Sequence, residues 1–325
     1  MSQTQQLPTD QHALVGAAVE RIWPDAAWDA EPIEDGMTNR NFKVTVRVAG
    51  DTPRVVVVQE QLAEDLAAAV GIRRSNQWRI WPEMTELGLA PALLGSFDDL
   101  GVTVVDFVDG DRAAEFADRD LVITLGARAL RRLHDATRGD ATPGLCSDPF
   151  EGIDWFASRV AAESPQFLEE FRWALDVVAR IKSVRGPYEV CQVHTDPSQV
   201  NMFVAPERDR MILIDWEYVG AGDGYLDLGH FAARYEMSPA EEETLVRAYE
   251  GTPLGPVERG LALVRLNRFI AMLREGLWSA LADGIDFLDF DHAAYARLSL
   301  DQMATTARRP DFEAAFDVLG DAAAG

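Results

Sequence analysis

One segment constrains the fold more than any other. Two apolar runs lie on either side of Pro206–Arg210, a polar stretch whose composition is typical of a hairpin turn. With the turn centred on Arg208, Asn201 is expected opposite Asp215 in the hairpin ladder. Asp196 lies just before the first strand. Two carboxylates and an amide at one end of a hairpin are hard oxygen ligands, suited to Mg²⁺ together with phosphate.

The residues before the hairpin carry the pattern H-x-D-x-x-x-x-N, from His194 to Asn201. Followed by an apolar strand that ends in aspartate, here Asp215, this spacing is the arrangement of catalytic loops of the protein-kinase kind. In such loops the first aspartate accepts a hydroxyl proton, the asparagine and the later aspartate hold Mg²⁺, and the histidine is structural. The alternative is that Asp196 caps a turn and Asp215 merely ends a strand.

The rest of the chain predicts two unequal parts. Before residue 108 the patterns indicate an initial helix, three strands and a helix interrupted by Pro82, in the order 10–23, 41–48, 55–58, 74–87 and 102–105. Beyond it they are mainly helical, with apolar residues spaced by four from Leu121 to Leu133 and long helices near 256–282 and 292–307. We therefore predict an α+β, two-lobed protein-kinase-like fold. A small antiparallel β-rich nucleotide-binding lobe (1–108) precedes a larger, mainly helical catalytic and substrate-binding lobe (109–325), with the ligand in the cleft between them.

Composition narrows the possible partners. The chain has 325 residues and a formal net charge of −24, which repels nucleic acid and anionic membranes and attracts cationic solutes, although it can equally reflect genome composition or adaptation to salt. Its two cysteines, Cys146 and Cys191, lack the spacing of a zinc site or a disulfide framework. With no signal peptide and no apolar run of about 18 residues, we expect a cytoplasmic protein that binds neither nucleic acid nor membrane. The oligomeric state is left open.

The segment His194–Leu228 resembles the choline/ethanolamine kinase branch of the aminoglycoside phosphotransferase superfamily. That branch carries H-N-D-x-x-x-x-N, then I-D-[WY]-E-Y, then an acidic position before a helix. Three further segments are similar: Gly36–Val44 to the G-x-T-N nucleotide loop, Gly88–Pro91 to a turn in the small lobe, and Gly276–Trp278 to the substrate region. The resemblance spans about residues 30–300 and is most specific from His194 to Asp227.

The resemblance implies a role for each matching residue. Asp196 would be the catalytic base, and Asn201 and Asp215 would hold Mg²⁺. Asp227 would hold the catalytic loop by hydrogen bonds, or alternatively cap the helix that begins at Leu228. His194 is expected to be structural. The nucleotide, ATP, would be bound by Thr38, Asn39, Gln59, Gln77, Asp106 and Val108. The substrate side would include Glu217, Glu275 and Trp278, with Glu217 either supporting the metal site or remaining a surface carboxylate.

The sequence departs from the family at two positions that are expected to be linked. Gln59 stands where a basic residue normally reaches the phosphates, and Gln77 stands where a glutamate normally pairs with that cation. Two neutral amides can hydrogen-bond each other instead. Loss of one charge-assisted hydrogen bond would weaken nucleotide binding by roughly 1.5–3 kcal/mol, unless Arg40, Arg73 or Arg74 substitutes.

The acceptor region departs as well. Trp278 matches a family aromatic residue that encloses an ammonium group, but Glu275 stands where another tryptophan is usual. Spaced three apart on a helix, the two could present a carboxylate and a ring to an amine, or could be a core tryptophan beside an ion-paired carboxylate.

Three functions follow from these expectations. The first is an ATP- and Mg²⁺-dependent kinase for the hydroxyl of a small, cationic metabolite. The second is a catalytically impaired pseudokinase with a ligand-binding or regulatory role, favoured by Gln59, Gln77 and Pro82. The third, an antibiotic-inactivating phosphotransferase, differs from the first only in its acceptor.

Overall fold

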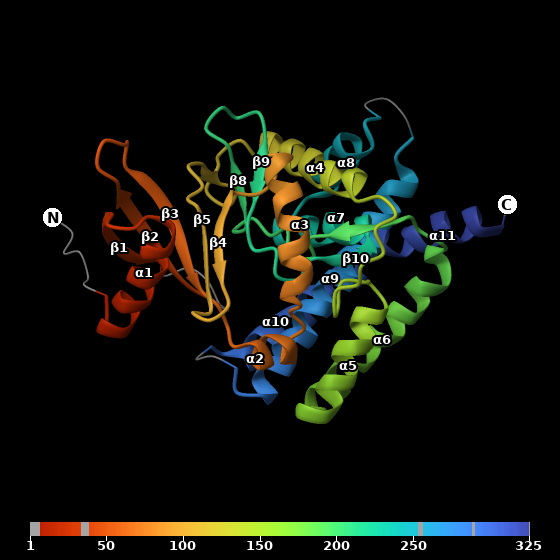
Figure 1. The fold of residues 1–325 in the computed structure, drawn as a ribbon. Helices are drawn as coiled ribbons and strands as arrows, with labels where there is room; N and C mark the ends of the chain where they lie inside the picture. Colours follow the sequence, from red (N-terminus) through yellow and green to blue (C-terminus); the bar gives the residue numbers. More distant parts are fainter. Residues whose placement is uncertain (1–6, 34–38, 253–255, 288–289, 325) are drawn as a thin grey trace. The chain divides into compact units, whose positions relative to one another are not determined.

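The computed structural model describes residues 7–33, 39–252, 256–287 and 290–324 (Figure 1). The chain divides into two compact units. Unit 1 comprises residues 1–69 and 81–109, and unit 2 comprises residues 70–80 and 110–325. Across the described residues, no helix combines the length and the apolar character needed to cross a membrane.

Unit 1 is built on a five-stranded antiparallel sheet with the strand order β1-β2-β3-β5-β4. The strands are β1 (Ala27–Ile33), β2 (Arg40–Arg47), β3 (Arg54–Glu60), β4 (Leu93–Phe97) and β5 (Val102–Asp106). The helices are α1 (Thr9–Ile22) and α2 (Glu64–Ala69), with α3 (Arg74–Glu86) shared between the two units. The predicted small antiparallel N-terminal region is confirmed.

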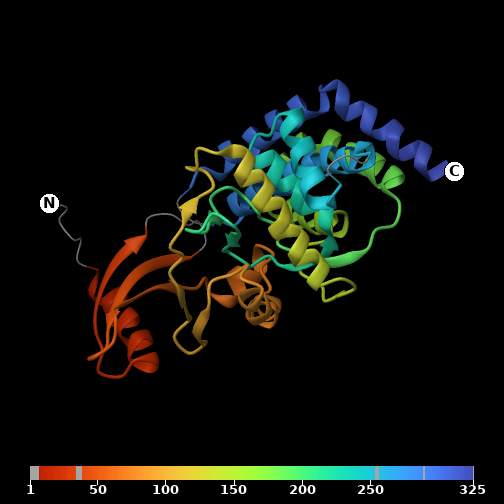
Figure 2. The same ribbon diagram turned by 90° about the horizontal axis from the view of Figure 1, so that it is seen from above.

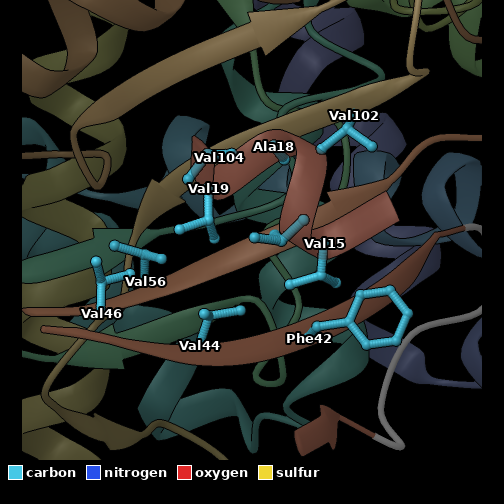
Figure 3. Close-up of a cluster of buried hydrophobic side chains, with 10 residues drawn as sticks. Val15, Ala18, Val19, Phe42, Val44, Val46, Val56, Val102 and Val104 are labelled. Carbon is cyan, nitrogen blue, oxygen red and sulfur yellow. The ribbon is translucent and has the colours of Figure 1, made fainter. Parts of the chain in front are cut away.

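The core of unit 1 follows from two periodicities. On β2, Phe42, Val44 and Val46 alternate with polar residues, so they face one side of the sheet. On α1, Val15 and Val19 lie one turn apart and form the buried face of that helix. These side chains are at most 2% exposed and pack against one another (Figure 3). Burial of each valine contributes about 1.5–3 kcal/mol.

Unit 2 is mainly helical, as predicted. Its helices are α4 (Arg119–Ala136), α5 (Glu151–Glu163), α6 (Pro165–Arg185), α7 (Gly224–Arg234), α8 (Pro239–Glu250), α9 (Glu258–Gly284), α10 (His292–Ala307) and α11 (Pro310–Ala324). Helix α9 packs against α5, α7, α10 and α11, and most of its residues are buried. Figure 2 shows this gathering of helices, coloured from green to blue. A helix that buries most of its surface belongs at the centre of such a bundle.

Five short strands accompany these helices. Strands β6 (Asp111–Arg112), β8 (Met202–Val204) and β9 (Met211–Leu213) form one antiparallel sheet, in which β8 and β9 are the predicted hairpin. Strands β7 (Val190–Val193) and β10 (Gly220–Asp223) form a two-stranded antiparallel pair that the sequence patterns do not predict. Each has only four residues, too few to show an alternating pattern.

The register of the hairpin differs by one residue from the prediction. Met202 pairs with Leu213, and the amide of Ile214 donates to the carbonyl of Asn201 at 2.9 Å. Asn201 is therefore opposite Ile214, and the expectation that it is opposite Asp215 is wrong. The turn centre lies half a residue before Arg208, and Asp215 leaves the strand with a φ of +67°.

The helix predicted near 74–87 is present, but Pro82 does not interrupt it. A proline removes one N–H donor from a helix. The bonding resumes beyond it, since the amide of Leu87 donates to the carbonyl of Glu83 at 3.0 Å. Helix α3 therefore continues through Pro82, and the predicted interruption of the helix is wrong.

Candidate active site

The site is built around the loop that joins β7 to β8, and a buried carboxylate holds the start of this loop. Asp227 Oδ2 accepts a hydrogen bond from the amide of His194, and Oδ1 accepts one from the amide of Thr195, each at 2.8 Å. Thr195 has a φ of +69°, a strained conformation that such bonds stabilise. The Asp227 side chain is completely buried on α7. It therefore fixes the backbone immediately before Asp196.

Asp227 stays ionised although it is buried. Burial raises the pKa of its carboxyl, but the hydrogen bond and charge of His134 and the bond from the His194 amide lower the pKa further, so that the net shift is downward. His134 Nε2, from α4, lies 3.0 Å from Asp227 Oδ2. The N-cap of α7 is Asp223, whose side chain accepts from the amide of Tyr225, so the alternative role of Asp227 as a helix cap is wrong.

His194 is placed as a structural residue. It has no exposed surface, its Nε2 lies 3.0 Å from the carbonyl oxygen of Ile214, and its ring packs against Trp216 with centroids 4.6 Å apart. Burial lowers the pKa of the imidazole, which keeps the ring neutral near pH 7. The neutral ring, bonded to the backbone carbonyl of Ile214, joins this loop to the residue after β9.

Asp196 is held in position from two sides. Asn201 Nδ2 donates to Asp196 Oδ2 at 2.8 Å, which brings together two of the predicted site residues. The other oxygen, Oδ1, lies 3.2 Å from Nε2 of His230, a fully buried side chain on α7. Burial raises the pKa of the Asp196 carboxyl, but the neighbouring His230 lowers it more, with smaller contributions from His194 and Arg234. The carboxylate is therefore ionised near neutral pH and available to accept a proton.

Asp215 is in the opposite electrostatic situation. Burial raises the pKa of its carboxyl well above the usual value, and the negative charges of Glu217 and Asp196 raise it further. Glu217 is only 3% exposed, so it is not a surface carboxylate. Clustered carboxylates of this kind are stabilised by a divalent cation. An all-oxygen set fits Mg²⁺, and Asn201 and Asp215 are the residues that would hold it.

Magnesium should therefore stabilise the protein through Asp215. A carboxyl whose pKa is raised by folding contributes stability at low pH, and this contribution is lost as pH rises through the folded-state pKa. At pH 7.5 the ionised Asp215 therefore lowers the free energy of unfolding of the ion-free protein. With free Mg²⁺ at about ten times its Kd, we expect a gain of about 1.4 kcal/mol, or a rise in Tm of about 2–4 °C. Differential scanning fluorimetry with and without Mg²⁺ measures it. Asp215→Asn should abolish the gain, and Asp176→Asn, an exposed carboxylate on α6, should preserve it. A full gain in Asp215→Asn would contradict this metal assignment.

Four residues that the sequence patterns missed lie around Asp196 and the backbone that precedes it. Arg274, on α9, donates to the carbonyl of Thr195 at 3.3 Å and so ties that helix to the catalytic loop. Tyr295, on α10, donates to Glu275 Oε2 at 3.0 Å and accepts from Arg234 Nη1 at 2.7 Å. His230 and Arg234 follow Asp227 at positions three and seven along α7, a helical spacing that could have identified both.

The two predicted acceptor residues on α9 are in different surroundings. Glu275 lies in this polar network, with its side chain 18% exposed. Trp278 is 8% exposed, its ring lies edge-on to Phe287 and His292, and its Nε1 donates to the hydroxyl of Tyr218 at 2.7 Å. The structure therefore places Trp278 in an aromatic cluster, whereas Glu275 remains beside the catalytic loop.

The predicted nucleotide-binding residues are divided between the units. In unit 1, Asn39 Oδ1 accepts from the amide of Leu62 at 3.3 Å. Asp106 forms a two-point ion pair with Arg54, and Val108 follows β5. Gln59 lies on β3, whereas Gln77 belongs to unit 2 and is buried on α3, so their mutual hydrogen bond stays a prediction. Thr38 lies outside the described residues.

Unit 2 contains a cavity of about 400 Å³. Its wall includes His134, Arg138, Arg185 and Tyr249. Asp196, Asn201 and Asp215 do not line it, so it is separate from the site described above.

Comparison with known proteins agrees with this geometry. The sequence matches the phosphotransferase enzyme family over residues 29–263, which is more than half of the chain. No curated protein matches it. Among solved structures, it is similar to a choline/ethanolamine kinase family protein from Mesorhizobium loti, at 21% identity and a TM-score of 0.72, covering 96% of this chain and 99% of that one.

Two further structures are similar. A choline kinase from Streptococcus pneumoniae shares 17% identity with a TM-score of 0.70, covering 91% of this chain and 100% of that one. A spectinomycin phosphotransferase in complex with ADP and spectinomycin shares 11% identity with a TM-score of 0.56, covering 97% and 98%. At these identities the likeness shows the fold, and the predicted α+β class with its protein-kinase-like neighbours is confirmed. The match over residues 29–263 shows the family: this chain belongs to the phosphotransferase enzyme family.

Proposed function

We propose that the protein is an ATP- and Mg²⁺-dependent kinase that transfers the γ-phosphoryl group to a hydroxyl of a small molecule. The observation that carries the proposal is the contrast between two neighbouring carboxyls. Asp196 has a lowered pKa and is held by Asn201, whereas Asp215 has a raised pKa and lies among other carboxylates. The first suits a proton acceptor, and the second suits a cation ligand.

In the proposed mechanism, Asp196 accepts a hydrogen bond from the acceptor hydroxyl and takes its proton as the oxygen attacks the γ-phosphorus. The new O–P bond forms while the bond to the β-γ bridging oxygen breaks, and ADP leaves. Magnesium, held by Asn201 and Asp215, would neutralise charge on the phosphates. Asp227 and Arg274 contribute by keeping the loop around Asp196 in one conformation, which is most of what such catalysis requires.

The acceptor expected from the sequence is a cationic amino alcohol of the choline or ethanolamine kind, or an aminoglycoside. The net charge of −24 would attract such molecules. Mg-ATP turnover against choline, ethanolamine, other amino alcohols and aminoglycosides tests the kinase function. Acceptor-dependent release of ADP supports it. Absence of turnover together with absence of Mg-ATP binding in calorimetry would overturn it in favour of a pseudokinase.

The pseudokinase alternative is favoured by Gln59 and Gln77, and restoring the charged pair tests it. With Gln59→Lys and Gln77→Glu together, we expect nucleotide affinity to rise by about 10–100-fold, because one charge-assisted hydrogen bond to phosphate is regained. Isothermal calorimetry with Mg-ATP measures the change. Arg128→Gln, on the exposed face of α4, is the control. Unchanged affinity would show that position 59 does not reach the phosphates.

A further inference from the structure

The acceptor side of the catalytic loop contains an arginine that sequence reasoning did not identify. Arg234 lies four residues after His230 on α7, and therefore on the same face of the helix. His230 Nε2 is 3.2 Å from Asp196 Oδ1. The guanidinium of Arg234 also contributes to the electrostatic environment of Asp196 and of Glu275. It is thus a permanent positive charge close to the proposed base.

Among the described residues, no carboxylate pairs directly with Arg234. Within the parts of the chain that the structure describes, its one hydrogen bond is from Nη1 to the hydroxyl of Tyr295, at 2.7 Å, and no carboxylate oxygen lies within 4.0 Å of it. Elsewhere the excess of acidic residues gives most arginines an ion pair, and Glu242 alone receives Arg265, Arg268 and Arg309. A guanidinium presents five N–H donors in a planar fork, which matches a carboxylate or a phosphate. Four of the five N–H donors of Arg234 therefore have no hydrogen-bond partner among the described residues.

The groups that a cationic acceptor would need are already engaged. Glu275 Oε2 accepts from Tyr295, and its Oε1 lies 3.8 Å from Arg274 Nη1 and 3.8 Å from His230 Nε2. The guanidinium of Arg274 lies over the ring of Tyr218, and its central carbon is 4.9 Å from the ring centroid. A quaternary ammonium would have to compete with the protein's own cation for this ring and this carboxylate.

We propose that the acceptor is a small hydroxy acid, whose carboxylate binds Arg234 while its hydroxyl meets Asp196. This inference rests on the phosphotransferase function proposed above and replaces the cationic acceptor by a carboxylate-bearing one. A carboxylate is favoured over a phosphate ester because Asp196 and Glu275 lie close by, and repulsion from them grows with the charge of the ligand. An additional amino group on the acceptor is compatible with the same contact.

Three acceptors that share a hydroxyethyl skeleton test the proposal. Ethanolamine carries only the cation, 3-hydroxypropionate carries only the carboxylate, and serine carries both. We expect kcat/KM for the two carboxylate-bearing acceptors to exceed that for ethanolamine by about 30-fold, the factor that corresponds to about 2 kcal/mol for a charge-assisted pair. Choline serves as a second cation, and glycerol 3-phosphate, which carries hydroxyls and a phosphate ester but no carboxylate, reports on a preference for phosphate esters.

Variants at position 234 test whether Arg234 causes the preference for carboxylate-bearing acceptors. Arg234→Gln should remove the preference by raising KM, and Arg234→Lys should restore part of it. Arg128→Gln should leave the preference unchanged. Two results would overturn the proposal: a preference for ethanolamine or choline that Arg234→Gln leaves intact, and an equal loss of kcat for every acceptor, which would assign Arg234 to the transferred phosphoryl group. Stronger binding of the phosphate ester than of 3-hydroxypropionate would also contradict it.

Binding measurements separate this proposal from the kinase function itself. Calorimetry with 3-hydroxypropionate and with ethanolamine is independent of turnover. Binding of the carboxylate that Arg234→Gln abolishes, in a protein without ADP release, would uphold the anion site and overturn the kinase. Turnover of ethanolamine without binding of 3-hydroxypropionate would do the reverse.

Discussion

Replacement of Asp196 by asparagine is expected to lower kcat for phosphoryl transfer by about 10²–10⁴-fold, the usual contribution of a positioned general base. The change keeps the size of the side chain but removes the charge and the basic oxygen that faces the acceptor hydroxyl. The bond that now joins Asn201 Nδ2 to Asp196 Oδ2 can still form to an amide oxygen. The KM for Mg-ATP should change little, because the proposed metal ligands Asn201 and Asp215 remain.

The measurement is ADP release under saturating acceptor and Mg-ATP, with far-UV circular dichroism and thermal unfolding to verify the fold. Asp176→Asn on α6 is the matched control, since it removes an exposed carboxylate from the same unit. Full activity in Asp196→Asn would refute the role of Asp196 as base. An unchanged kcat together with a raised KM for the acceptor would show that Asp196 binds the acceptor without activating it.

The second large effect is on stability. Asp227→Ala should lower the free energy of unfolding by about 3–5 kcal/mol, because it removes a buried carboxylate and leaves its buried hydrogen-bond partners unsatisfied. The amides of His194 and Thr195 would lose their acceptor, and Nε2 of His134 would lose its partner. Activity should fall as well, because Thr195 holds a strained φ of +69° directly before Asp196. Urea denaturation of the full chain measures the loss, with tryptophan fluorescence as the readout of unfolding. Asp176→Ala is the control.

The pH dependence of this effect has a definite sign. Because folding lowers the pKa of Asp227, its contribution is present above the unfolded-state value of about 3.9 and is lost as pH falls through the folded-state pKa. The pKa of His194 is also lowered, so protonation of the unfolded chain below about pH 6.5 costs further stability. The difference between wild type and Asp227→Ala should therefore be full at pH 7 and should shrink only below about pH 4. A difference that grows on acidification would contradict this assignment.

Much of the backbone could be predicted because the information is local. The alternation around Phe42 and Val44 specifies a strand, and the four-residue spacing from Leu121 to Leu133 specifies a helix. The pattern from His194 to Asn201, followed by a turn and a second apolar run, specifies a loop and a hairpin. The same pattern does not specify the register of the hairpin, because the register depends on where the turn is centred. Asn201 lies opposite Ile214 and not, as predicted, opposite Asp215. The short strands β7 and β10 escaped prediction because four residues carry no usable period.

The sequence by itself therefore determined the family, the fold class and the identity of Asp196, Asn201 and Asp215 as the candidate site, because these residues lie within one continuous segment. Only the tertiary structure decided which ionisable groups meet them. The pairs His134–Asp227, Arg274–Thr195 and Arg234–Tyr295 join residues that are 93, 79 and 61 positions apart. Such pairs form only where α4, α7, α9 and α10 pack around the loop, and no local pattern records that packing. The charge around the proposed base Asp196 depends on the folded chain, and so does the kind of acceptor that we propose.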